Sequence, residues 1–348
     1  MSQVFQLCIL RLSAIGDVCH AVAMVTRIRQ HRPDIKITWI IGKIEHQLLR
    51  GMLDVEFIVY DKKAGKKAKQ EVRQALAGRT FDAMFVMQVA LRANLLSKVV
   101  KAKRRIGFDW NRSKEGHWWF TNERIEAQKY AHVLEGFMGF ADKLGIPKDP
   151  YPRWNMPLDK TDWEWAKEKT AALGKYAVIS PAASKAERNW TVQGYVAVAQ
   201  NLIERGYKVV ICGGPGPLDL RISAQILQTP GIVALNLVGQ TSLKQMLAVL
   251  ADAALVLAPD TGPAHMATTM GTPVVGLYAH SNFRRTGPYL SQELVASVYD
   301  VQIKSQKGKE WVYLPWGIRA KGKDLMTYLL VLTVLKKVDE ALSELDTE

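Results

Sequence analysis

The chain has 348 residues, of which 48% are hydrophobic, 23% charged and 9% aromatic. This length suffices for two domains, and the composition excludes a disordered, collagen-like or coiled-coil protein. The three cysteines, Cys8, Cys19 and Cys212, are widely spaced among apolar or small residues. They predict neither a disulfide framework nor a tetrahedral metal site, so we expect no bound metal and a reducing compartment.

The N-terminal segment does not have the pattern of a secretory signal. No basic region precedes the apolar run at 5–10, and no small-residue cleavage site follows it. The longest apolar stretch, 325–335, has about half of the roughly 20 residues that a membrane-spanning helix needs, and it is flanked by Asp324 and Lys336. We therefore expect a cytoplasmic protein without a transmembrane segment.

The positive charge of the chain lies mostly in its first half. Residues 1–150 contain 26 Lys and Arg against 15 Asp and Glu, a net charge of +11, whereas residues 151–348 carry +3 of the total of +14. Such a surface attracts anions, which include nucleic acid, an acidic membrane leaflet and an anionic substrate. A solvated basic face without a partner is the alternative.

Short apolar runs alternate with helical patterns throughout the first half. The apolar runs predict strands at 5–10, 36–42, 56–61, 81–87 and 104–109. Helical spacing predicts helices at 18–32, 95–102 and 131–144, and an amphipathic Lys-rich segment that ends at Leu76. This alternation is typical of a parallel sheet wound with helices.

The stretch 146–159 contains four prolines and no periodicity, so it predicts a domain boundary. The second half then repeats the alternation, with predicted strands at 176–182, 208–214, 234–239, 254–260 and 273–279. We expect an α/β protein with Rossmann-like domains at 1–150 and 151–322. An amphipathic terminal helix, within 323–348, is expected to pack back across the interdomain junction onto the first domain.

Open α/β sheets bind ligands at the carboxyl ends of their strands, so two such domains predict a cleft lined by strand-to-helix loops. In the first loop, 11–17, Gly16 permits a tight turn with backbone amides free for an anion. Asp17 follows at the start of a helix. Either this carboxylate interacts with the helix dipole, or it is a general base that takes a proton from a substrate hydroxyl.

The loop at 258–267 combines a helix cap, a glycine and a histidine. Asp260 or Thr261 can cap the helix, Gly262 lets a ligand approach the backbone, and the free amides of the helix start would stabilise a diphosphate. His265 lies one turn into the helix, either within reach of the ligand or as a buried structural residue.

Two further loops of the second half carry polar residues. The loop after the first strand offers Ser184, Lys185 and Arg188, which form either a clamp for phosphate groups or a solvated surface. A glycine-rich loop after the next strand ends at Asp219, which either binds a ribose hydroxyl or starts a helix.

Together these loops resemble those of glycosyltransferase family 9, the ADP-heptose:lipopolysaccharide heptosyltransferases, over nearly the whole chain. The most specific match is 260–267, DTGPAHMA, which is similar to the family signature D-[ST]-G-x-x-H-[LIM]-A. The loop 11–17, RLSAIGD, resembles the family's N-terminal glycine–aspartate loop, and 104–108 and 188–190 fit as well. The chain departs from the family in the position of the ribose-binding acid and at 87–94, which lacks a glycine after the glutamine.

The resemblance implies a GT-B fold, whose first domain binds the acceptor and whose second binds the nucleotide sugar. It implies transfer from ADP-heptose with inversion of the anomeric centre, without a cofactor or metal, and with Asp17 as the base. The donor-binding residues that it implies are Ser184, Arg188, Asp219, Asp260, Thr261, Gly262 and His265.

The acceptor that the resemblance implies is a Kdo residue of lipid A, phosphorylated or not, and therefore anionic. We expect its acidic groups to contact the basic first half. The candidate acceptor-binding residues are Ser13, Gly16, Lys62, Lys63 and Arg92, with Lys66, Lys67 and Lys69 in the same run of lysines. Four aromatic residues, Trp110, Trp118, Trp119 and Phe120, either contact the inner membrane or belong to the core. We expect peripheral association with the cytoplasmic face of that membrane.

Two alternatives stay open: a family 9 transferase that uses another nucleotide sugar, and a nucleotide-binding protein without catalysis. A nucleic-acid-binding protein would need basic residues interleaved with stacking aromatics, or a recognised module, and neither is evident. We therefore expect no nucleic-acid partner.

Overall fold

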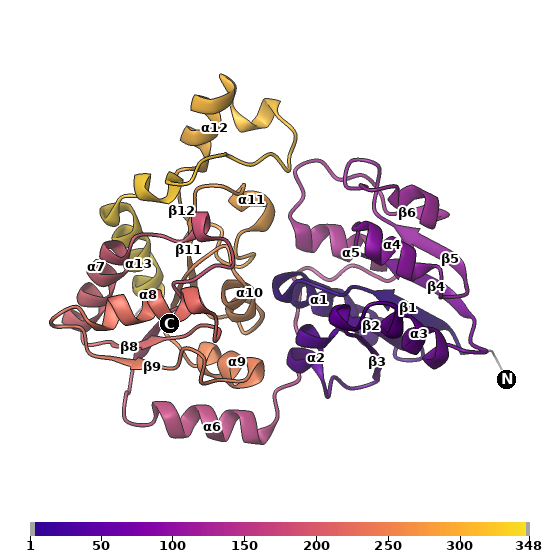
Figure 1. The fold of residues 1–348 in the computed structure, drawn as a ribbon, viewed down its shortest axis with the longest axis horizontal. Coiled ribbons are helices and arrows are strands. Elements are labelled where there is room, and N and C mark those ends of the chain that lie inside the picture. The colour runs from indigo at the N-terminus through magenta and orange to yellow at the C-terminus, as the bar shows by residue number, and fades with distance from the viewer. Residues whose placement is uncertain (1–3, 346–348) are drawn as a thin grey trace. The chain divides into compact units, whose positions relative to one another are not determined.

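The computed structural model describes residues 4–345, which form two compact units that meet between Pro157 and Leu158. Each unit contains a six-stranded parallel sheet with helices on its faces (Figure 1). No helix within residues 4–345 has the length and hydropathy of a membrane span.

The first unit has the strand order β3-β2-β1-β4-β5-β6. Its strands are β1 (Gln6–Leu10), β2 (Lys36–Gly42), β3 (Val55–Tyr60), β4 (Phe81–Val86), β5 (Ala102–Gly107) and β6 (Glu123–Arg124). Its α-helices are α1 (Ile15–His31), α2 (Lys43–Leu49), α3 (Lys66–Ala75), α4 (Leu91–Ser97) and α5 (Val133–Lys143). The order reverses between β1 and β4, which is where open α/β sheets bind their ligands.

The burial of β1 explains its place at the centre of this sheet. Its residues 7–10 are all apolar and have no exposed surface, because β2 and β4 flank the strand and helices cover the sheet. Helices α1 and α5 pack against each other. Helix α5 stops where predicted, since Gly145 adopts a φ of +74°, a conformation that glycine reaches without strain.

The second unit has the strand order β12-β11-β10-β7-β8-β9, with its reversal between β7 and β10. Its strands are β7 (Tyr176–Ile179), β8 (Lys208–Ile211), β9 (Ala234–Asn236), β10 (Val256–Pro259), β11 (Val274–Tyr278) and β12 (Ala296–Ser297). Its α-helices are α6 (Lys160–Thr170), α7 (Val192–Glu204), α8 (Pro217–Leu227), α9 (Leu243–Ala251), α10 (Gly262–Thr269), α11 (Phe283–Thr286), α12 (Tyr299–Lys307) and α13 (Val331–Leu345).

The unit boundary lies seven residues after the predicted one, at 157 rather than 150. Two hydrogen bonds explain the difference. The indole Nε1 of Trp154 donates to the carbonyl of Cys19 at 3.0 Å, and the amide of Asn155 donates to Thr26 Oγ1 at 3.2 Å. The proline-rich segment therefore follows α1 of the first unit before the chain leaves it.

The C-terminal segment corrects two expectations. A short 3₁₀ helix, Leu325–Tyr328, precedes α13, so the predicted helix is interrupted. Helix α13 packs against α7, β11 and β12, and its residues Val334, Val338 and Leu342 belong to the core of the second unit. The expectation of a separate segment that crosses back to the first domain is therefore wrong for residues 331–345, while 346–348 lie outside the described residues.

A buried hydrogen-bond network fixes the loops that follow β4 and β5. The Nδ1 atom of His117 lies 2.9 Å from Asn94 Oδ1, and its Nε2 accepts the amide hydrogen of Phe108 at 3.2 Å. The amide group of Asn94 donates to the carbonyls of Val89 and Glu115, each at 3.2 Å. Burial, with the charge of Arg124, lowers the pKa of His117 to about 4. The neutral imidazole thus holds two loops together.

Replacement of His117 by Gln should remove a pH-dependent part of the stability. The unfolded chain protonates this histidine below its ordinary pKa of 6.5, whereas the folded chain does so only near pH 4. Its contribution is therefore complete above pH 6.5 and is lost as the pH falls toward 4, by roughly 3 kcal/mol. We expect the wild-type advantage in unfolding free energy, from denaturant titrations at pH 7 and pH 4, to shrink accordingly. An advantage that is the same at both pH values would contradict this.

Candidate active site

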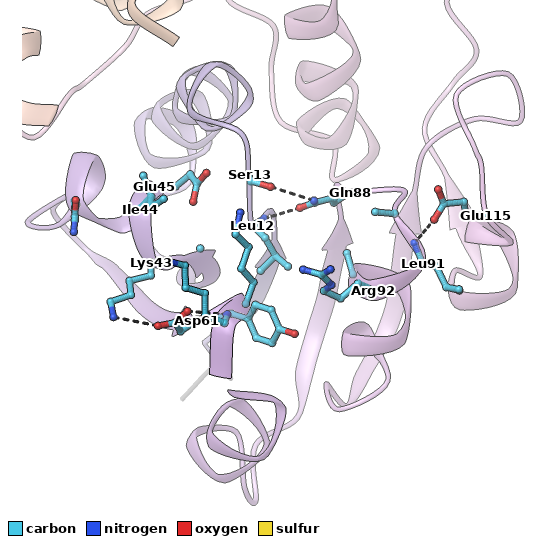
Figure 2. Close-up of a pocket in the computed structure, with 17 residues that line it drawn as sticks. Leu12, Ser13, Lys43, Ile44, Glu45, Asp61, Gln88, Leu91, Arg92 and Glu115 are labelled. Carbon is cyan, nitrogen blue, oxygen red and sulfur yellow. Dashed lines mark hydrogen bonds and ion pairs between the residues drawn. The ribbon is translucent and has the colours of Figure 1, made fainter. Parts of the chain in front are cut away.

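A cavity of about 610 Å³ lies in the first unit at the carboxyl ends of its central strands (Figure 2). Four of the predicted acceptor-binding residues, Ser13, Lys62, Lys63 and Arg92, line it. The fifth, Gly16, is buried in the first turn of α1 and is not a lining residue. The remaining lining residues are Leu12, Gly42, Lys43, Ile44, Glu45, Gln47, Tyr60, Asp61, Gln88, Ala90, Leu91, Ala93 and Glu115.

Cationic groups enter this cavity from two sides. On one side, Asp61 holds Lys43 and the backbone of Lys63 in place. Its carboxylate accepts hydrogen bonds from the amide of Lys63 at 2.9 Å and from Lys43 Nζ at 3.1 Å. These bonds hold the pKa of Asp61 below its ordinary value. The side chains of Lys62 and Lys63 are exposed, and Arg92 is exposed on α4 across the cavity (Figure 2). An anion in the cavity would thus meet positive charge on both sides.

Gln88 connects the loops that follow β1 and β4. Its Oε1 accepts the amide hydrogen of Leu12 at 2.8 Å, and its Nε2 lies 3.4 Å from Ser13 Oγ (Figure 2). The amide of Gly42, at the end of β2, donates to the carbonyl of Leu12 at 3.0 Å. The loop after β1 is therefore held in place from both neighbouring strands.

Asp17 lies in the first turn of α1, where Arg11 and Ala14 hold its carboxylate. The guanidinium of Arg11 forms an ion pair with Asp17 Oδ2, and the amide of Ala14 donates to the same oxygen at 3.1 Å. Arg11 in turn donates to the carbonyl of Met87 and lies over the ring of Phe137 at 5.2 Å. The Asp17 side chain is 32% exposed, so its second oxygen, Oδ1, remains available to another group.

In the second unit, Arg188, Asp260 and His265 lie together at the reversal of strand order. Asp260 Oδ2 lies 3.3 Å from Arg188 Nη1 and accepts the hydroxyl hydrogen of Ser281 at 2.9 Å. Asp260 Oδ1 lies 3.9 Å from His265 Nε2. Burial opposes the charge on Asp260, but the interaction with the nearby His265 and the charge of Arg188 hold the pKa of Asp260 below its ordinary value. Asp260 is thus a buried anion that positions two cationic or polar side chains.

The start of α10 offers further hydrogen-bonding groups beside this cluster. Thr261 precedes the helix with an extended backbone, and its side chain does not cap it. The Thr261 hydroxyl is buried and has no hydrogen-bond partner among residues 4–345. Gly262 and Pro263 begin the helix, whose first amides are unbonded by any cap side chain. Such a helix start binds anions, and Arg188 adds positive charge.

Ser184 and Asp219 lie on two other loops of the second unit. Ser184 is exposed in the loop after β7 that leads to Arg188. Asp219 lies in the first turn of α8, where its carboxylate accepts the amide hydrogen of Gly214 at 2.9 Å. Burial raises the pKa of Asp219, and this hydrogen bond opposes the effect. Asp219 therefore shapes the glycine-rich loop that precedes it.

The sequence analysis did not identify several residues of these sites. Lys43, Glu45 and Gln88 follow the ends of β2 and β4 closely, so their position after predicted strands was an available signal. Glu115 lies in an irregular stretch between β5 and β6, where no pattern indicated it. Ser281 becomes relevant only through its contact with Asp260. Residues 4–345 contain no group of three or more His, Cys, Asp or Glu side chains that could hold a metal ion.

Comparisons with known proteins agree on one family. The sequence model of glycosyltransferase family 9 (heptosyltransferase) matches residues 70–316. The lipopolysaccharide core heptosyltransferase OpsX of Haemophilus influenzae is 43% identical over 329 residues, which are 94% of each chain. Lipopolysaccharide heptosyltransferase 1 of Escherichia coli K12 is 22% identical over 82% of this chain and 92% of its own.

Solved structures share the fold. A family 9 glycosyl transferase of Veillonella parvula aligns with a TM-score of 0.80 at 21% identity, over 98% of this chain and 97% of its own. The E. coli heptosyltransferase WaaC with ADP aligns with a TM-score of 0.73 at 20% identity, over 97% and 100%. The predicted GT-B fold with two Rossmann-like domains is confirmed. The chain belongs to glycosyltransferase family 9, the heptosyltransferases, and is a glycosyltransferase.

Proposed function

We propose that this chain transfers heptose from ADP-heptose to a Kdo residue of lipid A during synthesis of the lipopolysaccharide core. The observation that carries the proposal is the cationic cavity of the first unit, which opens beside the loop that bears Asp17. The relative OpsX is a lipopolysaccharide core heptosyltransferase, which supports the lipopolysaccharide core as the product. WaaC has been solved with ADP and with ADP-2-deoxy-2-fluoro heptose, which supports the donor.

The proposed reaction is a single displacement with inversion. The acceptor hydroxyl attacks the anomeric carbon of the donor, its proton passes to Asp17, and the bond from that carbon to the diphosphate oxygen breaks. Arg188 and the first amides of α10 neutralise the charge that develops on the leaving ADP. Asp260, which lies 3.3 Å from the Arg188 guanidinium, holds it in place.

The surroundings of Asp17 suit a base. Both printed bonds to its carboxylate, from Arg11 and from the amide of Ala14, go to Oδ2. Within the described residues no hydrogen bond reaches Oδ1, so this oxygen can accept the proton of a hydroxyl. Arg11 is anchored to the carbonyl of Met87 and therefore fixes the direction in which Oδ1 points.

Asp17→Asn keeps the shape of the side chain but removes the base. We expect kcat for transfer from ADP-heptose to Kdo-lipid A to fall about 10²- to 10⁴-fold, while the Kd for ADP stays unchanged. Asp34→Asn, at an exposed carboxylate after α1, serves as a matched control with wild-type turnover. If the Asp17 variant turns over normally, the proposed base is wrong. Loss of ADP binding instead would favour a binding role for this residue.

The run of lysines separates into two groups. Lys62 and Lys63 line the cavity, whereas Lys66, Lys67 and Lys69 belong to α3 and are not lining residues. We therefore assign contact with the acidic groups of the acceptor to Lys62 and Lys63, together with Arg92. A Kdo that carries a phosphate would gain most from these cations, because its charge is higher.

The double variant Lys62→Ala, Lys63→Ala should raise KM for the acceptor about tenfold or more and leave KM for ADP-heptose unchanged. The increase should be larger for phosphorylated than for unphosphorylated Kdo-lipid A. The double variant Lys66→Ala, Lys67→Ala removes the same charge outside the cavity and should have wild-type kinetics. Equal effects of the two double variants would show that only overall charge matters and would refute the assignment.

An aromatic and basic patch of the first unit, made of Trp110, Trp118, Trp119 and Arg124, supports contact with the membrane surface. Trp119 is 81% exposed and Trp110 is 60% exposed. The guanidinium of Arg124 lies 4.0 Å from the ring centroid of Trp110. Phe120 is buried, so it belongs to the core and not to this patch. Indole rings beside cations favour an anionic lipid interface, in keeping with peripheral attachment to the inner membrane.

Trp110→Ala with Trp119→Ala should weaken binding to vesicles that contain anionic lipid by about fivefold or more, measured by sedimentation. Tyr151→Ala, which removes another exposed aromatic ring of the first unit, should bind like the wild type. Unchanged binding of the double tryptophan variant would exclude this patch as the contact surface.

A further inference from the structure

Glu45 is a buried carboxyl in the wall of the cavity. Helix α2 begins directly after β2, and Glu45 in its first turn is only 9% exposed. The carbonyl oxygen of Leu12 and the Oε2 atom of Glu45 both occupy the space that a side chain at position 42 would need, so Gly42 leaves room for the backbone of the loop after β1 and for this carboxyl. In Figure 2, the carboxyl points from α2 toward the part of the cavity where Ser13 lies.

The cavity is lined by three carboxyl groups, and Glu45 differs from the other two in its partners. Asp61 is held by Lys43 and by the amide of Lys63, and Glu115 accepts the amide hydrogen of Leu91. The carboxyl of Glu45 interacts with its own backbone amide, and no hydrogen bond or ion pair joins it to another of the described residues. The oxygens of Glu45 still reach the cavity, so a ligand bound there can donate a hydrogen bond to them.

The charges of three nearby residues, Asp17, Arg11 and Lys62, act on the carboxyl of Glu45. Burial raises the pKa of this carboxyl, and the negative charge of Asp17 adds to the effect. The positive charges of Lys62 and Arg11 act in the opposite direction. Glu45 is thus close enough to the proposed base and to a proposed acceptor-binding lysine for their charges to act on its carboxyl.

We propose that Glu45 determines acceptor specificity by accepting a hydrogen bond from a sugar hydroxyl next to the one that Asp17 deprotonates. Lys62, Lys63 and Arg92 bind the acidic group of the same acceptor, so the sugar is held at two points of opposite charge. An acidic group turned toward Glu45 would meet a like charge, and the acceptor can enter in only one orientation. This inference rests on the proposed function, because it needs an acceptor in this cavity.

Kinetics of Glu45→Ala and Glu45→Gln test the inference. We expect Glu45→Ala to raise KM for the acceptor about 10- to 100-fold, with KM for ADP-heptose unchanged. Glu45→Gln retains a hydrogen-bonding carbonyl oxygen and should recover most of the loss. Glu71→Ala, at an exposed glutamate on α3, is the control and should match the wild type.

A second substrate separates recognition from a structural role. An acceptor analogue that lacks the hydroxyls adjacent to the attacking one should have the same KM with wild type and Glu45→Ala. The unfolding midpoint of Glu45→Ala should stay close to that of the wild type, since the carboxyl is bonded to no other described residue. An unchanged acceptor KM, or a lower unfolding midpoint together with higher KM values for both substrates, would overturn the inference.

A direct measurement of acceptor binding tests the role of Glu45 without relying on catalytic turnover. Calorimetry with Kdo-lipid A in detergent should show the same 10- to 100-fold weakening for Glu45→Ala. If the wild type binds the acceptor but transfers no heptose, the proposed function fails while the binding difference still supports Glu45. If the wild type transfers heptose and Glu45→Ala binds the acceptor equally well, the inference about Glu45 alone is refuted.

Discussion

The ion pair between Arg11 and Asp17 is the constraint on which the first unit's site depends. Arg11 is nearly buried, is bonded to the carbonyl after β4 and lies over the ring of Phe137 on α5. It therefore joins β1, β4 and α5 at the point where strand order reverses. Asp17 pairs with Arg11 through Oδ2 and leaves Oδ1 without a hydrogen bond to any described residue, so one interaction both fixes the loop after β1 and orients the proposed base.

Each unit has an ion pair at the reversal of its strand order, and the sign of the positioning residue differs between the two units. In the first unit a cation, Arg11, pairs with an anion, Asp17, the proposed base. In the second unit an anion, Asp260, pairs with a cation, Arg188, which we propose binds the diphosphate. In both units the pair lies at the reversal of strand order, where diverging loops leave room for a ligand. Each positioning partner is only slightly exposed, so its charge acts on the other with little screening by water.

The sequence was informative where local chemistry decides the structure. Strand-end loops with a glycine and an acid, such as those of Asp17 and Asp260, could be predicted because parallel strands must present these loops at one edge. The position of Glu45 in the cavity wall could not be predicted, since it depends on the absence of a side chain at Gly42 and on burial by segments distant in the sequence. The division between the units falls within the proline-rich stretch 146–159, but its place at 157 reflects the bond from Trp154 back to α1, a tertiary contact that no local pattern indicates.

The division of labour between the units is the central claim, and hydrogen–deuterium exchange tests it most directly. ADP should protect amides of the second unit at 183–190 and 261–265 and leave the first unit unchanged. A soluble phosphorylated Kdo glycoside should protect amides of the first unit at 12–17, 43–46 and 88–93. Protection of the first unit's cavity by ADP, or of the loop at 261–265 by the Kdo glycoside alone, would contradict the account.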